Sequence, residues 1–165
     1  MVYCNSIHYI TDKEKLLRDI KDKLNNRGVL AFNTSFYDGS HPKESQEFYR
    51  KWMFRAIRLL YKDYKLKPIK SEKVSSRKHL TPEDYIDLLK DTGFKVEYVN
   101  ATSYNVPVDG FHYISEFKDW IEGILPGVPL EYGKKTLQKS LRQIFKEMEL
   151  VSVPRNWLSV RAIAI

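Results

Sequence analysis

Polar side chains follow two apolar stretches of the chain, directly after each stretch ends. Residues 29–32 form a continuously apolar run that is typical of a buried strand, and a polar segment beginning at Asn33 comes next. A shorter apolar stretch, residues 1–4, leads in the same way into Asn5. Ligands bind at the carboxyl ends of the strands in an open parallel sheet. The sequence therefore predicts a ligand cleft beside Asn5 and Asn33.

The residue types that bind metal ions or activate nucleophiles are present but scattered. The histidines at positions 8, 41, 79 and 112 have no paired spacing, and Cys4 is the one cysteine. A single cysteine excludes an internal disulfide framework and a cysteine-rich zinc site. The sequence contains no GxxxxGKS/T phosphate loop, no GxSxG nucleophile elbow and no glycine-rich dinucleotide motif after a strand. We therefore expect no metal site, and the cysteine usage fits a reducing, cytoplasmic setting.

The elements that must position the cleft are predicted as a strand, a helix and a second strand. Thr11 followed three residues later by Glu14 is typical of the capping box at a helix start. Leucine and isoleucine side chains then recur at helical spacing through residue 24, and the Asn-Asn-Arg-Gly sequence of residues 25–28 closes the helix. Two strands joined by one helix form a right-handed crossover unit.

A long aromatic helix is predicted over residues 42–64. Its apolar side chains are too many for one narrow stripe, so the helix either lies deep in a core or covers a pocket. Core packing is the favoured interpretation, and a lid over an apolar ligand is the alternative. The polar, basic residues 62–79 that follow are predicted as a loop. Residues 40–80 are therefore interpreted as an inserted cap helix with its basic loop, within a single domain of residues 1–165.

The second half of the chain supplies further helices and two strands. A helix is predicted to begin at Thr81, because an N-cap threonine is followed there by proline and two acids. Alternating apolar and polar residues predict a strand over 94–98. The remaining predicted elements are a turn-rich passage over 104–110, helices over 115–124 and 132–148, and a buried strand over 156–165. Strands alternating with helices indicate the α/β class.

The formal net charge is +7, and the main excess of positive charge lies in the loop residues 62–78. A solvated basic surface is the favoured interpretation, although such a loop can also contact an anionic substrate, a carrier protein or nucleic acid. No nucleic-acid-binding motif accompanies the charge, and no apolar run approaches the roughly 20 residues of a membrane helix. We therefore expect neither nucleic acid nor a membrane as the partner.

Four segments, in order, resemble class I S-adenosylmethionine-dependent methyltransferases. Residues 2–39 are similar to the fourth strand, the following helix and the fifth strand of that family, with LNNRGVLAFNT matching the approach to the fifth strand. LTPEDYIDLLKDTGFKVEYV resembles the helix and sixth strand, and PRNWLSVRAIAI resembles the closing strand, which pairs antiparallel between the fifth and sixth. The resemblance implies a partial Rossmann-like methyltransferase sheet, strands four to seven, with helices on its faces and an inserted helical cap.

The resemblance also implies roles for residues after the fourth strand. Cys4, Asn5 and Ser6 match the strand exit, where backbone groups meet the methionine end of S-adenosylmethionine. His8 and Tyr9 match positions that face the reacting centre. A base is needed only if the methyl acceptor must lose a proton, and His8 is the candidate. A hydrogen-bonded structural histidine is the favoured alternative for His8, and a small buried filler is the favoured interpretation of Cys4.

The implied acceptor site lies at the exit of the fifth strand. Asn33, Phe36 and Tyr37 match positions that line it, and Tyr49 and Trp52 are the candidates for a lid over a small molecule. Core packing is the alternative for Phe36 and Tyr37, and it is the favoured interpretation for Tyr49 and Trp52. Methyl transfer is an in-line displacement, so positioning of the acceptor does much of the catalytic work.

The chain also departs from the family, because the glycine-rich loop of strand one and the acidic ribose-binding residue are missing. We therefore expect the carboxyl-terminal half of a methyltransferase, truncated, split or degenerate, with impaired cofactor binding on its own. The exposed edge of its first strand is a liability. A second copy of the chain or the missing amino-terminal half is expected to cover that edge.

Three functions remain open from the sequence. The first is methyl transfer to a small, partly apolar molecule. The second is a non-catalytic binding or assembly module that keeps the methyltransferase fold. The third and weakest is nucleic-acid binding through residues 62–78, which predicts a steep salt dependence.

Overall fold

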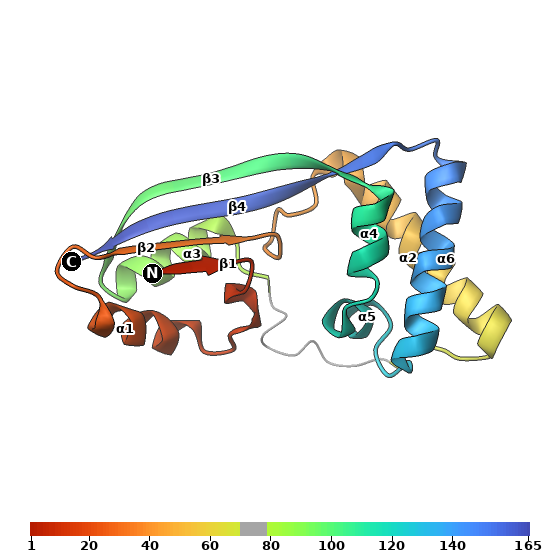
Figure 1. The fold of residues 1–165 in the computed structure, drawn as a ribbon, viewed down its shortest axis with the longest axis horizontal. Helices are drawn as coiled ribbons and strands as arrows, with labels where there is room; N and C mark the ends of the chain where they lie inside the picture. The colour runs from red at the N-terminus through yellow and green to blue at the C-terminus, as the bar shows by residue number, and fades with distance from the viewer. Residues whose placement is uncertain (70–78) are drawn as a thin grey trace. The chain divides into compact units, whose positions relative to one another are not determined.

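The computed structural model describes residues 1–69 and 79–165 and confirms the α/β class (Figure 1). The elements in chain order are β1 (Val2–Cys4), the 3₁₀ helix η1 (Ile7–Tyr9), α1 (Lys13–Lys23), β2 (Val29–Thr34), the 3₁₀ helix η2 (Lys43–Ser45), α2 (Gln46–Tyr64), α3 (Pro82–Asp91), β3 (Phe94–Pro107), α4 (Val108–Ile114), α5 (Lys118–Ile124), α6 (Leu130–Glu147) and β4 (Ser152–Ala164). The described residues form two compact units. The first comprises residues 1–42, 79–104 and 155–165, and the second comprises residues 43–69 and 105–154. The predicted single domain and its cap boundaries stay predictions.

The sheet has the strand order β1-β2-β4-β3 (Figure 1). β1 pairs parallel with β2, with Cys4 opposite Asn33, and β2 pairs antiparallel with β4, with Phe32 opposite Val160. The resemblance implied a closing strand between the fifth and sixth strands, and β4 occupies that position between β2 and β3. The partial Rossmann-like sheet is therefore confirmed.

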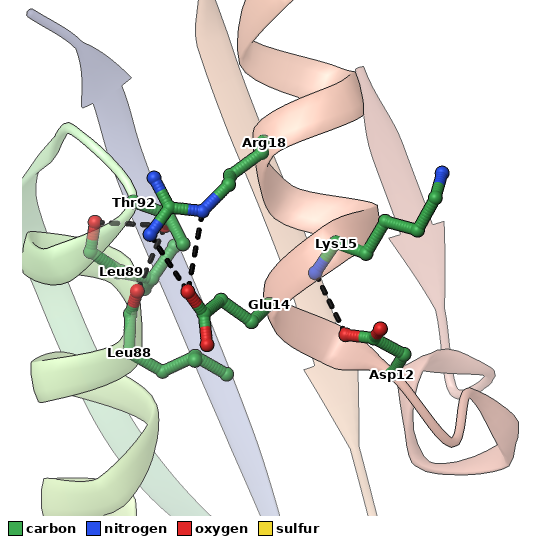
Figure 2. A network of polar contacts seen from close by, with 7 residues as sticks. All are labelled: Asp12, Glu14, Lys15, Arg18, Leu88, Leu89 and Thr92. Carbon is green, nitrogen blue, oxygen red and sulfur yellow. Dashed lines mark hydrogen bonds and ion pairs between the residues drawn. The ribbon is translucent and has the colours of Figure 1, made fainter.

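The first unit has its own core, built on one face of the sheet. Alternate residues of β2 and β4 are buried, as expected for strands that cover a core with one face. Apolar side chains of α1 and α3 join the same cluster, with Leu17 and Leu89 almost fully buried. α1 and α3 lie side by side (Figure 2). This packing fixes the ends of β1 and β2, where the predicted cleft lies.

The second unit has a separate, aromatic core. α2 and α6 pack side by side, and the ion pairs Arg55–Glu147 and Asp63–Lys139 show that they run antiparallel. Trp52 lies at the centre of this core with no exposed surface, and its indole Nε1 donates to the carbonyl oxygen of Leu137 at 3.0 Å. The remaining buried side chains of this cluster come from α2, α4, α5, α6 and the segments around them.

The predicted capping box at Thr11 is wrong. Asp12 is the N-cap of α1, and its Oδ1 accepts from the backbone N–H of Lys15 at 2.9 Å (Figure 2). Glu14 instead forms an ion pair with Arg18 at 2.7 Å on the helix surface. Aspartate is at least as good an N-cap as threonine, so the sequence offers two adjacent N-cap residues, and the helix begins after the second of them. The N-cap predicted for the later helix is confirmed at Thr81, which also forms a capping box with Asp84 at the start of α3.

Residues 104–110 are not the predicted turn-rich passage. β3 continues to Pro107 and α4 begins at Val108. The helix predicted over residues 115–124 is found as α5, which begins three residues later at Lys118, and the separate helix α4 before it was not predicted. The buried hydroxyl of Ser115 donates back to the carbonyl oxygen of Phe111 at 2.7 Å. Such back-bonding by serine competes with helix continuation, which is consistent with the break at this point.

Candidate functional site

The carboxyl ends of β1 and β2 lie next to each other, as the sequence predicted. Cys4 at the end of β1 is opposite Asn33 in β2, so the polar segments after both strands begin at one edge of the sheet. Asn5, His8, Asn33 and the residues after it therefore come together from segments that are more than 20 residues apart. These residues form the candidate site.

Asn5 joins the two strand ends by four hydrogen bonds. Its backbone N–H donates to the carbonyl oxygen of Asn33 at 3.0 Å and to the Asn33 side-chain Oδ1 at 2.8 Å. Its own Oδ1 accepts from the backbone N–H of Ser35 at 2.8 Å and from the Ser35 hydroxyl at 3.1 Å. The φ angle of Asn5 is +45°, in the left-handed region that asparagine tolerates better than most residues. Asn5 therefore fixes the backbone conformation at this edge of the sheet.

In the Asn5→Gly variant we expect the Ser35 amide to lose about 2 kcal/mol of protection against hydrogen exchange, because this buried amide loses its acceptor. Asn5→Ala is expected to lose about 1 kcal/mol more, because alanine also resists the positive φ. Hydrogen exchange of the Ser35 amide measures both losses. Equal protection in the wild type and in Asn5→Gly would show that the side chain of Asn5 does not organise the site.

His8 is held by a hydrogen bond and by two aromatic rings. It lies in η1 and is 8% exposed, and its Nδ1 is 3.1 Å from the Thr34 hydroxyl oxygen, which also accepts from the Phe36 N–H at 3.0 Å. The imidazole centroid lies 4.1 Å from the Tyr9 ring and 4.3 Å from the Phe36 ring. The tautomer of His8 decides which ring nitrogen can accept a proton. The arrangement fixes the imidazole in place, with Nδ1 bound to Thr34 and Nε2 buried, which suits a structural histidine better than a base that is open to a ligand.

A buried arginine from β4 completes this cluster. Arg155 is 3% exposed, and its Nη2 donates to the carbonyl oxygen of Ser35 at 2.7 Å. Its Nη1 lies 3.3 Å from Nε2 of His41, and its guanidinium lies over the Phe36 ring at 5.0 Å. Burial, followed by the positive charge of Arg155, lowers the pKa of His41 to about 4. His41 is therefore neutral near pH 7 and is able to accept from Arg155.

The other predicted site residues take different positions. Cys4 is exposed, so its interpretation as a buried filler is wrong: as the last residue of β1 it lies where only one neighbouring strand is described. Ser6 accepts from the Tyr9 N–H at 3.1 Å through its carbonyl oxygen. Tyr37 lies in the core of the first unit, and burial raises the pKa of its hydroxyl. Tyr9 is 53% exposed, so it can present a ring face to a ligand.

Tyr49 and Trp52, the lid candidates, belong to the second unit. They are 4% and 0% exposed, and both lie in its aromatic core. Their predicted role in substrate binding stays a prediction.

A separate groove of about 430 Å³ lies between the first turns of α1 and α3, and it contains none of the predicted site residues. It is lined by residues 11–14 together with Leu80, Asp84 and Leu88. Lys13 is buried here and donates to the carbonyl oxygen of Ile10 at 2.6 Å, and burial lowers its pKa. Figure 2 shows that Asp12 and Glu14 accept hydrogen bonds from Lys15 and Arg18 of α1, so these acids stabilise the first turns of the helix.

No group of three or more metal-binding side chains occurs among residues 1–69 and 79–165. Within the same residues, no helix has both the length and the apolar character needed to span a bilayer. At the strand exit, Cys4 is exposed and Asn5 and Ser6 are half-buried.

No protein-family model matches the chain, and no curated protein matches it. Among solved structures, a proposed methyltransferase from Bacillus halodurans C-125 is 12% identical with a TM-score of 0.50, covering 98% of this chain and 67% of that one. A proposed sarcosine dimethylglycine methyltransferase from Galdieria sulphuraria is 13% identical with a TM-score of 0.42, covering 98% of this chain and 51% of that one.

A third similar structure is phosphoethanolamine N-methyltransferase 2 from Haemonchus contortus, which was solved with phosphomonomethylethanolamine and S-adenosylhomocysteine. It is 17% identical with a TM-score of 0.37, covering 99% of this chain and 32% of that one. The chain thus spans about half or less of the latter two proteins. The similarity to the Bacillus halodurans structure confirms the methyltransferase fold expected from the sequence, and at this identity it concerns the fold alone.

Proposed function

We propose that this chain provides the acceptor side of an S-adenosylmethionine-dependent methyl transfer to a small, partly apolar molecule. The observation that carries the proposal is the placement of His8 between Tyr9 and Phe36, at the carboxyl ends of two adjacent parallel strands. Ligands bind at this edge in open α/β sheets. The shared methyltransferase fold supports the choice of reaction class.

The residues of the site would act by positioning and by proton transfer. S-adenosylmethionine, when bound, supplies the electrophilic methyl group. The exposed ring of Tyr9 and the partly exposed ring of Phe36 would pack against the acceptor and orient its lone pair. For His8 to take the proton that an amine or hydroxyl acceptor loses as the new bond to carbon forms, its buried Nε2 would have to become accessible to the acceptor. An acceptor without such a proton would need only the aromatic contacts.

We further propose that the cofactor site is completed by strands that pair with β1 from outside this chain. Among the described residues β1 pairs only with β2, and Val2 is 69% exposed. Hydrogen bonds to β2 use the carbonyl oxygen of Met1 and the N–H of Asn5. Because successive residues of a strand alternate in direction, Val2 and Cys4 direct their N–H groups to the other edge. Cofactor binding by the isolated chain is therefore expected to be weak.

A titration of the isotope-labelled chain with S-adenosylhomocysteine, followed by amide NMR, tests this function. Weak binding with shifts confined to residues 4–9 and 33–36 is the expected result. Asn5→Gly should reduce those shifts, and a variant of the distant Lys95 should not. A folded chain that shows no shifts at millimolar ligand would overturn the proposal and favour the non-catalytic binding module.

Sedimentation equilibrium of the same samples tests the edge of β1. A dimer that dissociates in the Val2→Pro variant would identify a second copy as the partner strand, since proline removes only the outward N–H. A monomer in both samples would contradict pairing between copies and leave a different chain as the source of the completing strands.

A further inference from the structure

The face of α2 that points away from its core carries large apolar side chains. Phe54 is 60% exposed and Tyr61 is 50% exposed, while Met53 and Ile57 are each 38% exposed. Positions 50, 54, 57 and 61 follow one another at intervals of three or four residues, so they lie along one face of the helix. The buried residues of α2 (Phe48, Tyr49, Trp52, Ala56, Leu59 and Leu60) lie on the opposite face. Burial in the unit's own core therefore does not account for the outer apolar residues.

Basic side chains surround this apolar face. Five exposed cations lie on this face or directly after it: Arg50, Arg58, Lys62, Lys65 and Lys67. Within the described part of the chain, none of these five side chains takes part in an ion pair. The nearest acids have other partners. Glu47 is bound to Lys51 at 2.9 Å, with a further favourable interaction from Arg50, and Asp63 is bound to Lys139 at 2.6 Å.

Two of these cations are stacked on an exposed ring. The ammonium groups of Lys65 and Lys67 lie 5.5 and 5.0 Å from the centroid of the Tyr61 ring. This places positive charge directly beside an apolar surface, and long lysine side chains can keep the charge in water while their stems contact apolar material. The outer face of α2 thus combines protruding apolar groups with a strong positive charge.

We propose that the outer face of α2 binds the surface of an anionic lipid bilayer. Phenylalanine, isoleucine and methionine enter the boundary between headgroups and acyl chains, tyrosine lies at the headgroup level, and the cations contact anionic headgroups. The apolar groups protrude from a convex helix, so they suit a deformable apolar medium. Nucleic acid would satisfy the cations, but it offers no apolar medium for Met53 and Ile57. The helix lies on the bilayer and does not span it, which differs from the expectation that no membrane is the partner.

Flotation with lipid vesicles tests this proposal on the full 165-residue chain. The chain should float with vesicles of phosphatidylcholine mixed with phosphatidylglycerol, and it should remain below vesicles of phosphatidylcholine alone. Replacing Arg58 and Lys62 by glutamine should weaken binding by about 30-fold, because each cation near an anionic surface contributes about 1 kcal/mol. Added salt should weaken binding of the wild type in the same direction.

Matched variants separate insertion from simple charge attraction. Phe54→Ser should weaken binding by about tenfold through lost apolar contact, whereas Phe117→Ser, at a position with 63% exposure, should bind like the wild type. Relative to the wild type, the fluorescence of Phe54→Trp should shift to shorter wavelength with anionic vesicles, and that of Phe117→Trp should not. Circular dichroism checks that each variant is folded.

Three results would overturn the proposal. The first is no flotation of the folded wild type with anionic vesicles. The second is an equal loss of binding in Phe54→Ser and Phe117→Ser. The third is salt-sensitive binding to RNA that exceeds vesicle binding and is unaffected by Phe54→Ser, which would assign the basic residues to nucleic acid.

Discussion

Lowering the pH from 6.5 to 4 is expected to reduce the free energy of unfolding by about 3 kcal/mol through His41 alone. Burial and the charges of Arg155 and His79 lower the pKa of His41 from 6.5 to about 4. Between these values the unfolded chain binds a proton at His41 and the folded chain does not, so stability rises with pH. The contribution is fully present above pH 6.5 and is lost as the pH falls to 4.

Urea unfolding of the wild type and of His41→Gln, each measured between pH 4 and 7, isolates this effect. Carboxylates and the other histidines titrate in both proteins, so only the difference between the two curves reports His41. The difference should change by about 3 kcal/mol across the range. Direct NMR titration of the His41 ring should give a low pKa that rises in Arg155→Gln, because a neighbouring positive charge is removed. Parallel stability curves for the two proteins would show that His41 is accessible to protons in the folded state.

Replacement of Trp52 by alanine is expected to destabilise the second unit by about 3–5 kcal/mol. The side chain is fully buried and its ring centroid lies 5.6 Å from Phe48 and 5.7 Å from Phe111. Truncation removes these contacts and the hydrogen bond from Nε1 to the carbonyl oxygen of Leu137, and it leaves a cavity. Urea unfolding followed by circular dichroism measures the loss. Trp52→Phe, which keeps a large ring but loses the hydrogen bond, should cost much less.

The Trp52 variants also distinguish a core residue from a lid over a ligand. A lid side chain contributes little to stability in the absence of ligand, so an unchanged free energy of unfolding in Trp52→Ala would favour the lid. A large loss of stability, with the amide shifts at residues 4–9 unchanged on ligand addition, would assign Trp52 to the core. The two readouts come from different units of the chain and therefore respond separately.

The strand ends of the site were predictable because they depend on local sequence. A continuous apolar run followed by polar residues indicates a buried strand and its exit, and the end of β1 was placed correctly, whereas β2 continues two residues further, to Thr34. The partners of Asn5 could not be predicted in detail, because they depend on the parallel register between β1 and β2. The left-handed residue before β2 is Arg27, with φ of +61°, although its glycine and asparagine neighbours tolerate that conformation better.

Arg155 was missed because its role arises from tertiary structure. It is separated from Ser35 by 120 residues and reaches it only through the antiparallel pairing of β2 with β4. A single arginine before an apolar strand is a weak signal by itself, since arginine is usually exposed. The length of β3 was underestimated for a related reason. Its second half, ATSYNVP, is largely polar and exposed, so the alternation that marks a half-buried strand is absent there.

The place of β4 in the sheet has a consequence for synthesis on the ribosome. β4 is the last element along this sequence, yet it lies between β2 and β3. The sheet cannot close until residues 152–164 have emerged, whereas the residues of the second unit are already translated by then. Units fold as they emerge, and pairing between distant strands is slow. The edge of β2 that pairs with β4 therefore stays open until β4 has emerged, while the other edge can already pair with β1, and we expect the nascent chain to engage chaperones through that open edge.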